Sequence, residues 1–201
     1  MFNNINIEED TRYEALITTV GSDNSYNTKP FGMVFKENVV KLNLYPNTTL
    51  KNIKDNPAFI IQITSNPLIF TKALLNKLDD SDYNEEGILN DVSYILYANA
   101  IDYMGVIQED KYGKTQITKI NAEITDVIKL NNSPSIINRT TNKIIELLVK
   151  LSRAQYLSKD EVLSFKKEID DSLNFIVKEG NQNHIDSLTL IKQELNNKKQ
   201  Y

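Results

Sequence analysis

A short polar run between two apolar segments carries the residue types that could hold an anion. Asn47, Thr48 and Thr49 follow Pro46, which ends an alternating, strand-like segment, and Lys51 comes two positions later. The pattern predicts the start of a helix, where the first turn leaves backbone N–H groups without an intrahelical acceptor. Those N–H groups, the threonine hydroxyls, the helix dipole and the lysine would all favour a phosphate.

The same run also has a simpler interpretation as a helix cap. A small polar residue at the N-cap satisfies one of the N–H groups, and no ligand is then needed. Taken alone, the run favours the cap. Lys51 does not decide between the two interpretations, because lysine is common in any helix.

A second candidate lies in the segment NTKPFGMVF, residues 27–35, which reads as a strand. Pro30 and Gly32 within it predict an edge position, a bulge or a close backbone approach. A simple bulge would account for Gly32. The alternative is that backbone groups from Phe31 to Val34 come close enough to read the edge of a flat heteroaromatic ligand.

Arg139 and Arg153 lie fourteen residues apart on one expected helix, over residues 138–156. That spacing places them within about 40° of the same helix face. An arginine beside an apolar stripe is either paired with a carboxylate or holds a ligand phosphate. The ion pair is the favoured interpretation for each.

The composition excludes several classes of function. The chain has 201 residues, a net charge of −4, no cysteine and one histidine, His184. These values exclude disulfides, thiolate metal sites and Cys nucleophiles, and they argue against His-based metal sites and non-specific nucleic-acid binding. The start of the chain does not resemble a signal peptide, and no apolar run is long enough to span a membrane, so we expect a cytoplasmic protein without a bound metal. We expect His184 to be a surface or capping residue.

Residues 13–64 alternate with a period of two, which is typical of strands, and 92–110 and 114–130 read as two long strands. Short spacers between the strands favour an antiparallel meander, and about six strands are enough for a small barrel. A short helix over 67–78 and an acidic surface loop over 77–87 interrupt the series. The expected strands are 13–20, 27–35, 38–45, 58–64, 92–110 and 114–130, the last two joined by a turn at Tyr112-Gly113.

After a linker at 131–135 the period changes to that of amphipathic helices. We expect three helices: one over 138–156, one opened by a Ser158–Glu161 capping box and ended by Gly180, and one over 183–195. The prediction is therefore an α+β protein, with a β-barrel domain over residues 1–130 and a helical subdomain over 131–201.

The order of several short motifs resembles one protein family. It is an archaeal family of flavin-binding split β-barrel proteins, domain of unknown function 447, and the resemblance extends over roughly residues 12–180. The motifs are Glu14…Thr18-Thr19, Asn27…Pro30-Phe31-Gly32, Leu44-Tyr45…Thr49-Leu50-Lys51-Asn52 and Asn138-Arg139…Ile145-Glu146…Arg153.

The resemblance implies a flavin-reductase-like split barrel that binds FMN non-covalently, as a homodimer with the flavin at the subunit interface. It places the flavin phosphate at Asn47, Thr48, Thr49, Lys51 and Asn52, and the isoalloxazine edge along Phe31, Gly32 and Met33. Arg139 and Arg153 match family positions, and their contact with FMN is our inference. Two departures are Pro46-Asn47-Thr48, where the family has a Gly-Ser type turn, and Ser65-Asn66-Pro67, where an acidic residue is expected.

Three functions are compatible with the sequence. The leading one is a flavin-dependent oxidoreductase, in which hydride passes between a nicotinamide or deazaflavin donor and the flavin. The second is a flavin-binding module without turnover, acting as carrier, sensor or assembly partner. The third is a scaffold without a ligand. No residue in the sequence has to act as an acid or a base, so none is assigned that role.

Overall fold

The computed structural model describes residues 12–84, 86–110, 113–130 and 139–197. The chain divides into two compact units. Within the described residues, 12–64 and 79–130 form a barrel unit, and 65–78 and 139–197 form a helical unit. Each unit is described by itself.

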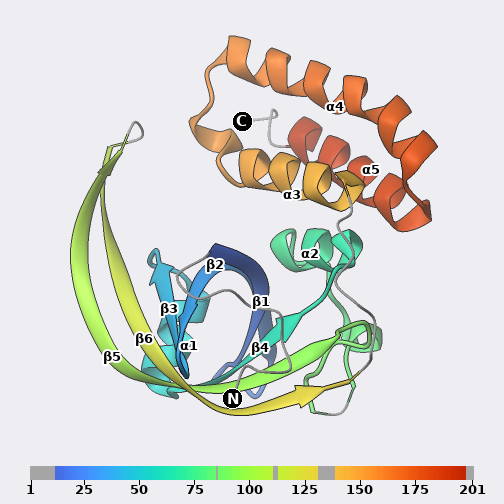
Figure 1. The fold of residues 1–201 in the computed structure, drawn as a ribbon. Coiled ribbons are helices and arrows are strands. Elements are labelled where there is room, and N and C mark those ends of the chain that lie inside the picture. Colours follow the sequence, from blue (N-terminus) through green and yellow to red (C-terminus); the bar gives the residue numbers. More distant parts are fainter. Residues whose placement is uncertain (1–11, 85, 111–112, 131–138, 198–201) are drawn as a thin grey trace. The chain divides into compact units, whose positions relative to one another are not determined.

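The barrel unit contains six strands that close into a barrel in the order β1-β2-β3-β6-β5-β4. All neighbouring strands are antiparallel, which confirms the predicted architecture. Figure 1 shows the strands curving around the interior. Their bounds are Arg12–Val20 (β1), Tyr26–Lys36 (β2), Val39–Leu44 (β3), Ala58–Ile63 (β4), Tyr94–Asp110 (β5) and Gly113–Lys129 (β6).

The barrel interior is filled by alternate residues of the strands, as the period of two predicts. Ile17, Met33 and Ile61 are fully buried in this core. Helix α1, Thr48–Asp55, contributes Leu50 and Ile53 to the same cluster. The helix is therefore held by its apolar side, and its first turn remains at the exposed end of β3.

The opposite face of the strands is also covered near β4, because the segment after residue 78 folds back on it. Gln62 is fully buried there although it points away from the core. Its Nε2 donates to Thr18 Oγ1 at 2.7 Å and to the Gly87 carbonyl at 3.3 Å, and its Oε1 accepts the Leu89 N–H at 2.7 Å. The expected acidic surface loop is thus a surface loop over most of its length: none of the 3₁₀ turn Asp80–Asp82 is buried, and Asn84 and Glu86 are exposed. Burial begins only at Gly87 and continues through Ile88 and Leu89.

Strands β5 and β6 continue beyond the other strands as a two-stranded ribbon, visible as the long green and yellow arm in Figure 1. β4 pairs with β5 only as far as Asn99, so the rest of β5 pairs with β6 alone. Apolar side chains are exposed along this stretch of β5: 59% for Ile101 and 56% for Met104, where β6 also pairs with β3, and 73% for Ile107 on the two-stranded part. The predicted turn at Tyr112-Gly113 falls partly outside the described residues, as does the predicted linker.

The helical unit consists of α2 Pro67–Leu74, α3 Arg139–Ser152, α4 Lys159–Glu179 and α5 Gln182–Asn197. The predicted capping box of α4 is present, with Ser158 and Glu161 exchanging bonds to each other's backbone N–H. Helix α2 ends four residues before the predicted end at 78. Asn76 has a φ of +56°, a left-handed conformation that cannot continue a helix.

Helix α2 also groups differently from the predicted division at residue 130, which assigned it to the barrel domain. It contacts α3 and α5, so it belongs to the helical unit although it lies between two barrel strands in sequence. The physical reason is its composition: Ile69, Phe70 and Ala73 are buried and need a partner surface, which the amphipathic helices supply.

The prediction of one helix over 138–156 was wrong at its C-terminal end. The Arg153 N–H bonds the Lys150 carbonyl, a tighter turn than the α-helical one, and α3 ends at Ser152. Arg153 therefore lies exposed in a turn, and it does not share a helix face with Arg139. The side chain of Arg139 lies outside the described residues.

His184 was expected to be a surface or capping residue. It is buried, so the surface alternative is wrong, but it exchanges bonds with Asn181 at the start of α5, which confirms the capping alternative. Its Nε2 lies 3.1 Å from Thr141 Oγ1, and its Nδ1 lies 2.7 Å from Asn181 Oδ1. Burial lowers the pKa of the imidazole. The side chain thus links the start of α5 to α3 within the helical unit.

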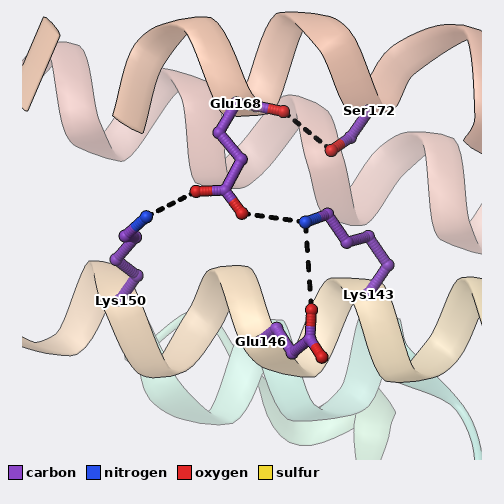
Figure 2. A network of polar contacts seen from close by, with 5 residues as sticks. All are labelled: Lys143, Glu146, Lys150, Glu168 and Ser172. Carbon is purple, nitrogen blue, oxygen red and sulfur yellow. Dashed lines mark hydrogen bonds and ion pairs between the residues drawn. The ribbon is translucent and has the colours of Figure 1, made fainter. Parts of the chain in front are cut away.

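A charged network joins α3 to α4, and Figure 2 shows its members facing one another across the two helices. Lys143 and Lys150 of α3 both donate to the Glu168 carboxylate of α4, the first at 2.8 Å. Lys143 also lies 3.8 Å from Glu146, and Ser172 Oγ donates to the Glu168 carbonyl at 2.7 Å. The two lysines hold the pKa of Glu168 below its ordinary value of 4.5.

Replacing Glu168 by glutamine should lower the free energy of unfolding at pH 7 by about 1 kcal/mol, because two charge-assisted bonds are lost from a half-buried position. A carboxylate with a lowered pKa stabilises the fold above its ordinary pKa, and that stability is lost as the pH falls below about 4.5. The parent and the variant should therefore converge in denaturation experiments at acid pH. Asp170→Asn, which removes the exposed Lys192–Asp170 pair, is the control and should have little effect at either pH. If the free energy of unfolding differs between parent and Glu168→Gln by the same amount at all pH values, the stabilisation does not come from the charged Glu168 carboxylate.

Candidate functional site: a helix start beside an open strand edge

Helix α1 begins as the sequence predicts, and Asn47 is its N-cap. The Asn47 side chain accepts the Leu50 N–H at 2.9 Å, and its carbonyl accepts the Lys51 N–H at 3.1 Å. The cap interpretation is therefore confirmed. In the part of the chain that the structure describes, no acceptor is found for the backbone N–H groups of Thr48 and Thr49, so the cap leaves two donors unused.

The five residues expected near a phosphate divide into two sets. Asn47, Thr48 and Lys51 are exposed at the start of α1, where they can meet a ligand from solvent. Thr49 and Asn52 are buried on the inner side of the same helix. The structure thus brings all five onto two turns of one helix, and only the first three face solvent.

The two buried residues belong to a polar cluster with the ends of β1 and β2. Asn27 Nδ2 donates to Thr49 Oγ1 at 2.9 Å and to Thr19 Oγ1 at 3.2 Å. Asn52 Nδ2 donates to Thr19 Oγ1 at 3.0 Å. The cluster fixes the first turn of α1 against the β1–β2 hairpin.

The residues predicted to contact the isoalloxazine edge, Phe31, Gly32 and Met33, lie on β2 next to an open edge of that strand. β3 pairs with β2 only from Met33 to Lys36. Between Tyr26 and Gly32, none of the described strands pairs with the β2 edge that faces β3. The other edge of β2 pairs with β1. Phe31 is half-buried against the core and Gly32 lies opposite Glu14, while the side chain of Met33 is fully buried in the barrel. Met33 can therefore offer a ligand only its backbone.

A shallow hollow of about 250 Å³ adjoins this edge on the outer surface of the barrel. Gly32 and Val34 of β2 form one side of it. β3 and β6 contribute two lysines and two asparagines, Lys41, Asn43, Lys119 and Asn121, together with Leu42 and Ile120. Asn121 also donates to Asp102 at 3.2 Å, so its amide is already oriented.

Sequence reasoning missed several residues of this site as contributors. Thr19 and Asn27 were noted only as part of the family motif, yet they lie directly opposite each other across the hairpin and hold α1. Lys29, on the same strand face as Asn27, is half-buried, and burial lowers its pKa. The signal that could have found Thr19 and Asn27 is the hairpin register, since both are close to the turn at residues 21–25.

Arg139 and Arg153 belong to the helical unit, which is described by itself, so their contact with a ligand at this site stays a prediction. Within the described residues no group of three or more His, Asp or Glu side chains could hold a metal ion. Of the helices that are described, none is both long and apolar enough to cross a lipid bilayer.

The fold and the site together define a class: a small closed antiparallel β-barrel in which a helix start with unused N–H donors adjoins an open strand edge. Residues 13–131 match the model of the N-terminal domain of a protein family of unknown function, DUF447. The chain belongs to this family, as its motifs predicted.

Two relatives extend over nearly the whole chain. The uncharacterized protein MJ1453 of Methanocaldococcus jannaschii is 26% identical over 187 residues, which cover 90% of this chain and 97% of that protein. The crystal structure of the FMN-bound protein MM1853 of Methanosarcina mazei has a TM-score of 0.75 at 16% identity, covering 94% of this chain and 96% of that one. The second comparison confirms the predicted fold.

Proposed function

We propose that this protein binds FMN and acts as a flavin-dependent oxidoreductase of the flavin-reductase-like type in the cytoplasm. The observation that carries the proposal is the start of α1, where Thr48 and Thr49 offer unused N–H groups next to the open edge of β2. A family member with the same fold is FMN-bound, which supports this choice of ligand. A helix start favours a doubly charged phosphate because its N–H groups and dipole both act on the anion.

The phosphate would lie against the first turn of α1, where Thr48 and Lys51 are exposed. The ring would lie along β2, with the Phe31–Gly32 backbone at its edge and the hollow beside Gly32 open to one side of it. Arg139 and Arg153 are kept as candidates for the same ligand on the strength of the family motif alone.

Bound flavin would supply hydride chemistry, with a reduced nicotinamide or deazaflavin as the donor. The part of this chain is to bind, orient and shield the cofactor. The residues found around the hollow include no Asp, Glu, His or Tyr. That observation favours the second candidate function, a flavin-binding module without turnover that serves as carrier, sensor or assembly partner.

The proposal includes a homodimer with the flavin near the subunit interface. The β5–β6 arm supports it, because its two-stranded part carries the 73% exposed Ile107 and is a poor structure in water by itself. A second copy packed on the Ile107 face of the arm would cover this side chain.

The visible spectrum of the purified protein tests the proposal. We expect flavin absorption either as isolated or after addition of FMN, and FMN should bind at least about tenfold more tightly than riboflavin because of its phosphate. A colourless protein that binds neither flavin would contradict the proposal. Bleaching by a reduced nicotinamide would favour the oxidoreductase, and a bound flavin that no donor reduces would favour the module.

A further inference from the structure

The buried cluster behind α1 determines how one hydroxyl can act, and this inference rests on the proposed function. Thr49 is almost completely buried, yet it lies in the first turn of α1, beside the exposed Thr48. Its Oγ1 accepts from Asn27 Nδ2 at 2.9 Å. In the described part of the chain no acceptor is found for the proton of this hydroxyl.

The orientation of the Asn27 amide follows from the other bonds in the cluster. A threonine hydroxyl has one proton to donate. The Thr19 hydroxyl donates its proton to the backbone carbonyl of Asn27, at 3.3 Å. The two amides that contact Thr19 Oγ1, those of Asn27 and Asn52, must therefore both present N–H groups. The second N–H of the Asn27 amide then points to Thr49, which can only accept it.

We infer that Asn27 is a positioning residue that makes the Thr49 hydroxyl a hydrogen-bond donor to the flavin phosphate. A hydroxyl whose lone pair is occupied by an amide keeps its proton for another acceptor. In a helix the usual alternative is the carbonyl four residues earlier, here that of Tyr45, and no such bond is found among the described residues. The donor would add to the N–H groups of Thr48 and Thr49, provided by the buried side of the same first turn, for a phosphate seated directly against that turn.

The inference assigns Asn27 a role in discriminating between flavins, distinct from a role in folding. Riboflavin has the same ring and ribityl chain as FMN but no phosphate. A residue that acts through the phosphate should change FMN affinity and leave riboflavin affinity nearly unchanged. A residue that only holds α1 in place should weaken both ligands equally.

The test is a double-mutant cycle on the ratio of the riboflavin and FMN dissociation constants, with Asn27→Leu and Thr49→Val. Asn27→Leu keeps the branching of the side chain, adds no charge and removes both hydrogen-bonding groups. We expect it to reduce the preference for FMN about tenfold, the usual loss for a hydrogen bond to a charged group. In the Thr49→Val background the same change should have no further effect on the ratio.

Thr18→Val is the matched control. Thr18 is about as buried as Thr49 and comes directly before Thr19 of the cluster. Its bonds, however, go to Thr28 and Gln62 on the other side of the strand. It should lower stability without changing the ratio. An Asn27→Leu effect that is equal for both flavins, or that persists in the Thr49→Val background, would overturn the inference.

Two further outcomes are informative. If Asn27→Leu does not fold, Thr49→Ser should keep the preference for FMN and Thr49→Val should lose it, and an unchanged preference in Thr49→Val overturns the inference. If the parent protein binds FMN and riboflavin equally, there is no phosphate site and the inference is overturned. If it binds neither flavin, the proposed function is overturned as well.

Discussion

Replacement of Gln62 by leucine should lower the free energy of unfolding of the barrel unit by about 3 kcal/mol or more. Leucine has a similar volume, so the loss comes from hydrogen bonding. The change leaves a buried N–H of Leu89 and a buried carbonyl of Gly87 without the partner that Gln62 gives them, and each such group costs about 1–3 kcal/mol. The Thr18 hydroxyl loses one bond but keeps its bond to Thr28. The loop that carries Gly87 and Leu89 can move toward water and hydrate these groups, which reduces the total cost.

Two measurements check the Gln62 prediction. Chemical denaturation gives the stability, and amide hydrogen exchange shows whether the loop detaches, since the Leu89 N–H depends on Gln62 Oε1. Asn99→Leu is the control, because Asn99 lies exposed on β5 of the same barrel, where a surface change is worth less than about 0.5 kcal/mol. Unchanged exchange at Leu89 in Gln62→Leu would contradict a role in holding the loop.

Gln62 also shows where sequence patterns stop predicting the fold. The alternation over 58–64 correctly predicted a strand with Phe59 and Ile61 in the core. A strand face that reads as polar is ordinarily solvated, and nothing local indicates that residues 79–92 return to cover Gln62. That information lies in a segment about twenty residues away, which itself reads as a polar loop.

Local signals predicted the helix boundaries better when the capping residue was recognisable. Asn47 and Ser158 start helices as expected, because their side chains accept a specific N–H. The ends of α2 and α3 were missed, since an asparagine at positive φ and a tightening last turn have no strong signature. The assignment of α2 to the helical unit depends on its partners and could not be predicted from its own residues.

The candidate site was predicted in part. The sequence indicated the helix start and the β2 edge because each consists of consecutive residues. It did not indicate that Thr49 and Asn52 face inward, or that Asn27 and Thr19 hold them, because those contacts join three different elements. The hollow beside Gly32 was missed for the same reason, since its walls come from β3 and β6.

Replacement of Ile107 by aspartate should dissociate the proposed homodimer, weakening self-association about a hundredfold or more. Ile107 is 73% exposed on the β5–β6 arm, so its loss should affect the folded protomer little. Burial of a carboxylate in an apolar interface is costly unless the charge is paired, so the effect should fall on association. Analytical ultracentrifugation across a concentration series measures it, and FMN affinity should fall with it if the flavin lies near the interface.

Gln108→Asp is the matched control for Ile107→Asp, because it adds the same charge to the neighbouring position of the same strand but removes no apolar side chain. Successive residues of a strand point to opposite faces, so Gln108 lies on the other side of the arm. If Ile107→Asp remains a dimer with unchanged FMN affinity, the arm does not form the interface. A parent protein that is monomeric and still binds FMN would remove the dimer from the proposal and leave flavin binding intact, so the two parts can be judged separately.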